Sequence, residues 1–157
     1  MAELKIVDTP AQKSIEEVSS FLKLPQYKLV KTLIYKYDGG IAAVLIRGDR
    51  EVNEIKLKRA LNNTVNLELA NDETVRNITG CEPGFAGPIN LKKDVKIVAD
   101  NSVKNLFNFV TGANEKDKHY LNVNYARDFQ IEKFYDIRLA NTGDICINCG
   151  AALEEYR

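Results

Sequence analysis

The chain has 157 residues, 45% of them hydrophobic and 28% charged, and its 22 basic and 22 acidic side chains cancel. This composition predicts one globular domain with a sizeable core, and it excludes a global positive field that would attract nucleic acid. Any RNA contact must therefore use a local patch or a neighbouring domain. The longest apolar run, 41–46, is too short to cross a membrane, and the N-terminus has no signal-peptide pattern, so we expect a cytoplasmic protein without membrane contact.

A helix is expected to begin at Ser14, after a polar lead-in over residues 1–13. Ser14 and the glutamate three residues later have the spacing of a capping box. Ile15, Val18 and Leu22 then recur at helical spacing, which gives the helix an apolar face. Such a face is more typical of a core than of a pocket wall.

Two apolar and β-branched runs, 30–37 and 41–47, flank Asp38-Gly39-Gly40 and predict a β-hairpin whose second strand is central and buried. In the first strand, period-2 alternation places Lys31 at the start of a face that is otherwise apolar or aromatic. Lys31 either extends to solvent or lies at the rim of a cavity, as the cation that meets an anionic ligand. The pattern leaves both interpretations open.

The rest of the chain predicts alternating short helices and strands. A carboxylate at a strand end, such as Asp100, is commonly a cap or a turn former. The expected elements are a helix over 53–61, a strand over 65–69, a helix from Asn71 or Asp72 through Ile78 that ends at Gly80, and strands over 95–99, 106–110 and 120–125.

The stretch Gly84-Phe85-Ala86-Gly87-Pro88, with Pro83 before it, must be a loop. Proline lacks an N–H and glycine leaves the backbone free, so neither a helix nor a central strand can continue through it. A loop without bulky side chains lets main-chain dipoles approach a ligand closely. The alternative is a tight connection between a helix and a strand.

His119 is the only histidine, and a lone histidine is more typical of a hydrogen-bonded structural residue than of a general base. Cys146 and Cys149 form a C-x-x-C-G turn near the C-terminus. Tetrahedral zinc needs four ligands, and this pair supplies two, so we expect no metal site.

Several segments, in one order along nearly the whole chain, resemble the editing domain that is inserted in bacterial prolyl-tRNA synthetases and is related to free-standing YbaK-type deacylases. These segments are Asp8-Thr9-Pro10, Val30-Lys31-Thr32-Leu33, Arg47-Gly48-Asp49 with Asn53-Glu54, the 84–88 loop, and Gly112-Ala113-Asn114 followed by His119-Tyr120.

We therefore predict an α+β fold, a single domain with a mixed, largely antiparallel β-sheet flanked by helices. The resemblance implies an editing domain over residues 1–140, followed by a tail over 141–157 that carries the cysteine turn and leads back to a parent synthetase.

The resemblance also implies an activity, namely hydrolysis of alanine mischarged onto the proline-specific tRNA, with no cofactor and no metal. A pocket shaped for proline cannot strictly reject the smaller alanine, because the lost contact is worth only about 1–3 kcal/mol. A second site that admits alanine and excludes proline solves this problem. The implied partners are the charged 3′ end of the tRNA and the catalytic and anticodon-binding domains of the synthetase.

By the same resemblance, Lys31 would hold the terminal nucleotide or orient the ester, and the glycine loop would hold the ester carbonyl and the attacking water. Ile15 and Val18 would form the wall of the pocket. Leu29 departs from relatives that have threonine there. The implied catalytic residues are Lys31, Gly84, Gly87 and His119, and the implied substrate-binding residues are Thr9, Ile15, Val18, Phe85, Ala86, Pro88 and Asp100.

Two alternative functions remain open at this point. The chain could be a free-standing trans-editing deacylase, or a non-catalytic module that binds the aminoacyl end of tRNA.

Overall fold

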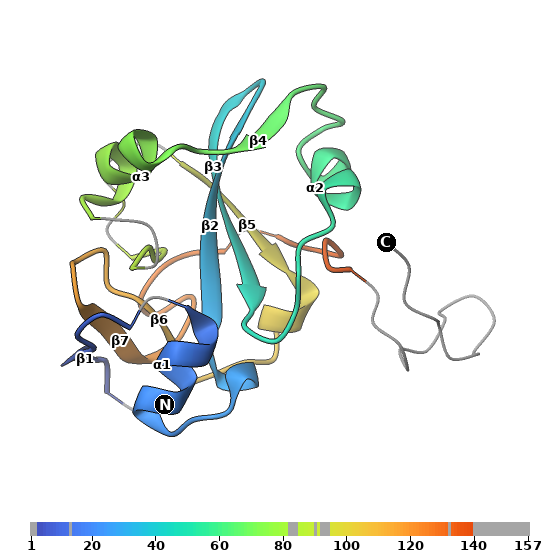
Figure 1. Ribbon diagram of the computed structural model, residues 1–157. Helices are drawn as coiled ribbons and strands as arrows, with labels where there is room; N and C mark the ends of the chain where they lie inside the picture. The colour runs from blue at the N-terminus through green and yellow to red at the C-terminus, as the bar shows by residue number, and fades with distance from the viewer. Residues whose placement is uncertain are drawn as a thin grey trace.

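The hairpin around Asp38-Gly39 is the centre of the fold (Figure 1). Strands β2 (Val30–Tyr37) and β3 (Gly40–Arg47) pair antiparallel, and Tyr37 lies opposite Gly40. β3 lies between β2 and β5 (Lys96–Asp100), with which it pairs in parallel, and its middle residues are fully buried. The predicted hairpin with a central, buried second strand is confirmed.

The computed structural model describes residues 3–12, 14–81, 85–89, 91, 95–131 and 133–139. The predictions that concern Gly84, the cysteine pair Cys146 and Cys149, and the tail over 141–157 lie outside these residues.

The described strands form two sheets, whereas the sequence predicted one. The larger has the order β4-β2-β3-β5-β8, with β4 at Leu67–Leu69 and β8 at Phe134–Tyr135; it is antiparallel up to β3 and parallel beyond it. The smaller is antiparallel, with the order β1 (Lys5–Asp8), β7 (Lys118–Val123), β6 (Phe109–Gly112). An isolated backbone bridge between Leu29 and Val110 connects the two. The α+β class and the mixed, largely antiparallel pairing are confirmed.

The small sheet shows where local patterns were misleading. The polar lead-in contains strand β1 (Lys5–Asp8), which is mostly exposed and therefore lacks a buried alternating pattern. Strand β6 (Phe109–Gly112) begins later than predicted, after Asn108 takes a positive φ of 52°. Strand β7 (Lys118–Val123) begins and ends two residues earlier than predicted.

The helices begin and end where their capping residues predict. Helix α1 (Ile15–Leu22) has Ser14 as N-cap in a complete capping box, and α2 (Glu54–Ala60) is capped by the side chain of Asn53. Helix α3 (Asp72–Thr79) is capped by Asn71 and ends at Gly80, whose φ of 84° suits glycine. Short 3₁₀ helices cover Gln26–Lys28 and Asn101–Val103. None of the helices in the described residues is long and apolar enough to cross a membrane.

The buried side chains of the described residues form four clusters, which pack around the large sheet. Val30, Leu45 and Phe109 belong to the cluster between the two sheets. Helix α2 packs on one side of the large sheet through Leu57, and α3 packs near Ile34 through its own apolar face. Helix α1 covers the junction of the two sheets, where its Val18 meets Leu29 and Val110. This junction positions the site described below.

Asp38, in the hairpin turn, is predicted to make a pH-dependent contribution to the free energy of unfolding. The side-chain amide of Asn66, and then the backbone N–H groups of Val65 and Asn66, donate to its carboxylate and lower the pKa of Asp38 from 3.8 to about 2. Because the folded pKa lies below the unfolded one, the contribution is complete above pH 3.8 and is lost as the pH falls toward about 2.

The advantage of wild type over Asp38→Asn in free energy of unfolding, measured with urea, should therefore shrink between about pH 6 and about pH 3. Glu68→Gln, on the neighbouring strand β4, controls for the loss of one negative charge. An advantage that stays constant with pH would contradict the prediction.

Candidate functional site

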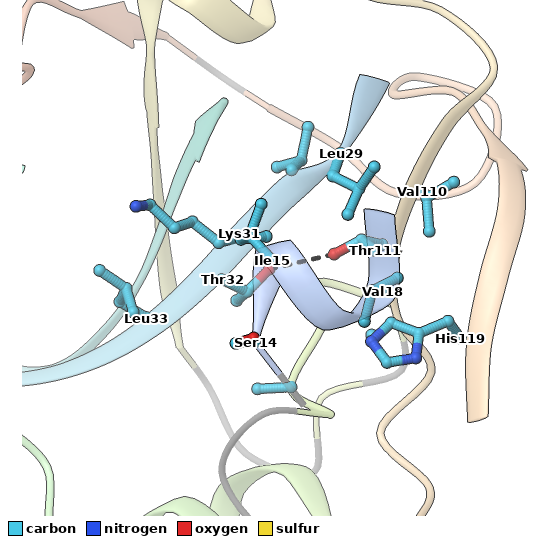
Figure 2. A pocket seen from close by; sticks show the side chains of 13 residues that line it. Ser14, Ile15, Val18, Leu29, Lys31, Thr32, Leu33, Val110, Thr111 and His119 are labelled. Atoms are coloured by element: carbon cyan, nitrogen blue, oxygen red, sulfur yellow. Dashed lines mark hydrogen bonds between the residues drawn. The ribbon is translucent and has the colours of Figure 1, made fainter. Parts of the chain in front are cut away.

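A cavity of about 230 Å³ lies where α1, the start of β2, and strands β6 and β7 meet (Figure 2). Its walls combine apolar side chains with a few polar ones. The lining residues are Ser14, Ile15, Val18, Leu29, Val30, Lys31, Thr32, Leu33, Ala86, Val110, Thr111, Gly112 and His119.

The apolar wall comes from α1 and from the junction of the two sheets. Ile15 and Val18, predicted as substrate contacts, both line the cavity, and Val18 is also buried against Leu29 and Val110. The same stripe therefore belongs to the core and to the cavity wall. The capping box at Ser14 fixes where the helix begins and thereby places Ile15 and Val18 on the side of the cavity.

Two buried hydroxyl groups supply polar contacts inside the cavity. Oγ1 of Thr32 on β2 and Oγ1 of Thr111 on β6 lie 3.4 Å apart, and Figure 2 shows the hydrogen bond between them. Sequence reasoning missed both as site residues. Position 29 is leucine rather than threonine, but Thr32 and Thr111 still supply hydroxyl groups to the site. The signal available was Thr32 itself, which directly follows Lys31 in the segment that carries the resemblance.

His119 lies at the start of β7 and its ring borders the cavity near Val18 (Figure 2). Its Nδ1 and the hydroxyl of Thr9 form a hydrogen bond of 2.6 Å, and the Phe85 ring meets it edge-on with centroids 5.8 Å apart. The N–H of Thr9 in turn donates to the carbonyl of Asp117 at 2.7 Å. Thr9 and Phe85 thus orient the imidazole, and neither of them lines the cavity.

The aliphatic part of the Lys31 side chain lines the cavity, and its ammonium group points out of the cavity. Figure 2 shows the side chain extending away from the His119 side, and Nζ lies 3.1 Å from Oε1 of Glu51. The side chain of Lys31 is 16% exposed, whereas that of Glu51 is 74% exposed. An ion pair with such an exposed carboxylate is weak, so an anionic group of a ligand can compete for the ammonium. Lys31 thus lies at the edge of the cavity, and its contact with an anionic ligand stays a prediction.

The described part of the glycine loop, 85–89, is held by Asn114. The N–H of Gly87 donates to Oδ1 of Asn114 at 2.7 Å, and Nδ2 of Asn114 donates to the carbonyls of Gly87 at 3.0 Å and Ile89 at 2.7 Å. A Cβ on Gly87 would lie 1.9 Å from the carbonyl oxygen of Gly112. Gly87 is therefore required by the close approach of two main-chain segments, and its own N–H and carbonyl are already bonded.

Of the described loop residues that were predicted for the site, Ala86 is the one that lines the cavity. Phe85 and Pro88 are buried behind it. Gly84 lies outside the described residues.

Asp100 is buried away from the cavity. Its carboxylate accepts the N–H of Ser102 at 2.8 Å and that of Ile137 at 2.9 Å, and it caps the short helix that begins at Asn101. Its interpretation as a cap is confirmed. Its position supports no direct contact with a ligand in this cavity. Among the described residues, no three His, Cys, Asp or Glu side chains are grouped in a way that could hold a metal ion.

The site is a small apolar cavity on a two-sheet α+β scaffold. It contains buried hydroxyl groups and an oriented imidazole, and a lysine lies at its rim. The chain belongs to the aminoacyl-tRNA editing domain family, whose model matches residues 9–129.

The curated relatives are proline–tRNA ligases. That of Syntrophotalea carbinolica is 51% identical over 99% of this chain and 27% of its own length, and that of Desulfitobacterium hafniense is 46% identical over 96% of this chain and 26% of its own length. The chain thus spans about a quarter of the length of the ligases it matches.

Solved structures share the fold. A candidate trans-editing enzyme for prolyl-tRNA synthetase aligns with a TM-score of 0.67 at 20% identity, and the match covers 74% of each chain. A scaffold protein from computational epitope grafting aligns with a TM-score of 0.71 at 17% identity and 86% coverage of each chain. At these identities the likeness concerns the fold alone.

The three hydrogen bonds of Asn114 to the 85–89 loop predict that Asn114→Ala strongly lowers the free energy of unfolding. The substitution removes three side-chain hydrogen bonds and leaves the backbone groups of Gly87 unpaired, which costs about 2–4 kcal/mol. Asn62→Ala is the matched control, because Asn62 is exposed and has a φ of 59°, close to the 56° of Asn114. Urea unfolding of both variants distinguishes the loss of the Asn114 hydrogen bonds from the effect of placing alanine at a positive φ. Equal losses of free energy of unfolding in the two variants would contradict the prediction.

Proposed function

We propose that this chain hydrolyses the ester bond of alanine mischarged onto the proline-specific tRNA, as the editing part of a proline–tRNA ligase. The observation that carries the proposal is the small cavity at the junction of the two sheets, in a chain of the editing family whose relatives are proline–tRNA ligases. The other synthetase domains and the tRNA are the proposed partners.

The size of the cavity suits an aminoacyl group. Its volume of about 230 Å³ is below the roughly 300–1,000 Å³ of pockets that hold drug-sized ligands. The volume alone does not distinguish alanine from proline, because the cavity is larger than a methyl group needs. The shape of the wall formed by Ile15 and Val18 would supply the distinction, through a clash with the pyrrolidine ring.

The proposed reaction needs water as the only co-reactant and no cofactor. The water oxygen adds to the ester carbonyl carbon and gives up a proton, and the carbonyl oxygen becomes an oxyanion. When the oxyanion collapses, the bond between the acyl carbon and the ribose oxygen breaks and the ribose oxygen takes up the proton, so that alanine and uncharged tRNA leave. His119, oriented by Thr9, would position the water. The main chain at Ala86 would face the oxyanion, since the N–H of Gly87 is bonded to Asn114.

Lys31 would exchange its bond to Glu51 for a bond to the tRNA end. The pair with Glu51 is exposed on the carboxylate side, so it costs little to break, and a phosphodiester of the tRNA end carries the same single negative charge and can take the place of the carboxylate. Positioning by this contact and by the cavity walls supplies most of the rate, because an aminoacyl ester is already activated.

The decisive experiment compares deacylation of the proline-specific tRNA charged with alanine and the same tRNA charged with proline. Loss of alanine with retention of proline supports the proposal. Stability of both esters in the presence of the protein would contradict it and favour a module that only binds the tRNA end.

Lys31→Ala should lower deacylation of the alanine-charged tRNA by about 10- to 100-fold, which corresponds to the loss of one charge-assisted hydrogen bond. Stability should change little, since the ammonium pairs only with an exposed carboxylate. Lys36→Ala is the control, because Lys36 is an exposed lysine of the same strand and does not line the cavity. An unfolded Lys31→Ala protein, or equal activity of the two variants, would contradict the role of Lys31.

Val18→Ala should widen the apolar wall and weaken the exclusion of proline. We expect the ratio of kcat/KM for the proline-charged over the alanine-charged tRNA to rise by about tenfold, the effect of roughly one methylene-sized contact. Leu57→Ala, a truncation in the α2 cluster away from the cavity, controls for loss of core packing. An unchanged ratio in Val18→Ala would remove this residue from the selection of the amino acid.

A further inference from the structure

A groove of about 410 Å³ lies where the C-terminal end of α1 packs against β6 and β7 (Figure 1). Val110 lines both this groove and the cavity of the candidate site, so the two are neighbours along β6. The other lining residues of the groove are Leu22, Leu24, Lys28, Asn108, Leu121 and Asn122. None of these six has a role in the reaction proposed above.

Three exposed aromatic side chains flank the groove. Phe21, Tyr27 and Phe107 are 46%, 51% and 58% exposed, and in the described part of the chain they are the aromatic members of the exposed large hydrophobic side chains. Each of them directly precedes, in the sequence, a residue that lines the groove. Single exposed apolar side chains are normal, but exposed aromatic rings gathered beside one groove indicate a contact surface.

The chain segments that form the groove are positively charged, although the 22 basic and 22 acidic side chains of the whole chain cancel. The lining residues come from three segments, 21–28, 104–110 and 121–124. These segments contain Lys23, Lys28 and Lys104 and no aspartate or glutamate. The groove therefore suits an anionic partner.

Lys28 brings the positive charge directly to an aromatic ring. Its Nζ lies 5.0 Å from the centroid of the Phe107 ring, and Lys28 also lines the groove. A cation–π contact at an exposed site is weak, so the ammonium group can turn from the ring to an anion of a ligand. The pair thus offers a flat apolar face and a cation side by side.

We propose that this aromatic surface, formed by Phe21, Tyr27, Lys28 and Phe107 beside the groove, binds single-stranded RNA. The ligand is the stretch of unpaired nucleotides that precedes the esterified nucleotide of the tRNA, so the inference rests on the proposed function. Aromatic rings that stack on bases, together with cations that bind the phosphates, are the combination by which proteins hold single strands. The surface is the local patch that a chain without net charge needs for an RNA contact.

The distance between the groove and the cavity fits such a strand. Ile15, the first residue of α1, lines the cavity, and Leu22, the last, lines the groove. The helical rise of 1.5 Å per residue places them about 10 Å apart along the helix axis. Stacked nucleotides follow one another at about 3.4 Å, so about three of them cover this distance. A strand that ends at the cavity can therefore pass along α1 and stack bases on Tyr27 and Phe107.

The chemistry of the surface favours a single strand over a protein or an RNA duplex. The centre of a protein–protein interface is depleted in lysine, whereas this surface has lysines and no carboxylate in its segments. A duplex offers phosphates, but its base faces are stacked inside the helix and would leave the aromatic rings uncovered.

The first arm of the test measures, by fluorescence anisotropy at low salt, binding of a labelled single-stranded RNA with the 3′-terminal sequence of the proline-specific tRNA. Tyr27→Leu and Phe107→Leu should each raise the Kd at least about fivefold, because leucine keeps apolar surface but lacks the flat ring. Tyr27→Phe keeps the ring and should bind as the wild type does. Ile55→Ser, at a side chain of α2 that is 65% exposed, controls for the loss of exposed apolar surface elsewhere.

Absence of binding by the wild type, or an unchanged Kd in either leucine variant, would overturn the inference. An unchanged Kd would instead favour this surface as an apolar contact for another domain of the ligase. An equal rise in Tyr27→Phe or in Ile55→Ser would also overturn it, because the effect would then not come from stacking on these rings.

The second arm measures how the Kd for the same RNA depends on salt. Lys28→Gln should lower the slope of log Kd against log salt by about 0.7, the contribution of one phosphate contact on a single strand. Lys36→Gln removes an exposed lysine of β2 that lines neither the groove nor the cavity, and should leave the slope unchanged. Equal slopes in the two variants would overturn the inference.

Deacylation of the alanine-charged tRNA separates this inference from the proposed function. Phe107→Leu should raise KM about fivefold and change kcat little, because the ring contacts RNA and not the reacting ester. An unchanged KM would overturn the inference while the deacylation itself still supports the proposed function. A wild-type chain that binds the RNA but leaves the alanine ester intact would contradict the proposed function and support the RNA contact.

Discussion

The close approach of two main-chain segments, at Gly87 and Gly112, is the constraint on which the site depends. No side chain fits between them, since a Cβ on either glycine would collide with a carbonyl oxygen of the other segment. Asn114 fixes this approach by bonding both backbone groups of Gly87. The loop is thereby held against the β6 strand end, and Ala86 is placed at the wall of the cavity.

Three parts of the site, namely His119, Lys31 and the loop, are each held by a partner that does not line the cavity. Thr9 orients His119, Glu51 holds the ammonium of Lys31, and Asn114 holds the loop. In the first and last of these contacts both partners are buried or partly buried, whereas the ion pair ends on an exposed carboxylate and is therefore exchangeable. This arrangement suits a reaction in which a reactive ester needs placement more than activation.

Local patterns were sufficient for those parts of the fold that local chemistry decides. The capping box at Ser14, the turn at Asp38-Gly39 and the end of α3 at Gly80 were predictable because each depends on a few adjacent residues. Strand β1 and the division into two sheets were not, because an exposed edge strand has no buried alternation and the sheets meet through residues far apart in sequence. For the same reason Thr111 and Asn114 were missed. The catalytic role of Gly87 stays a prediction, and the structure adds that this residue permits the close packing of two main-chain segments.

The bridge between Leu29 and Val110 has a mechanical consequence. Both residues line the cavity, and in the described chain this isolated bridge is where the two sheets are joined by backbone pairing. The other strand pairings of the described residues lie within one sheet or the other. The width of the cavity therefore follows from the angle at which the two sheets meet, and the side chains of Val30, Leu45 and Phe109, packed between the sheets, hold that angle.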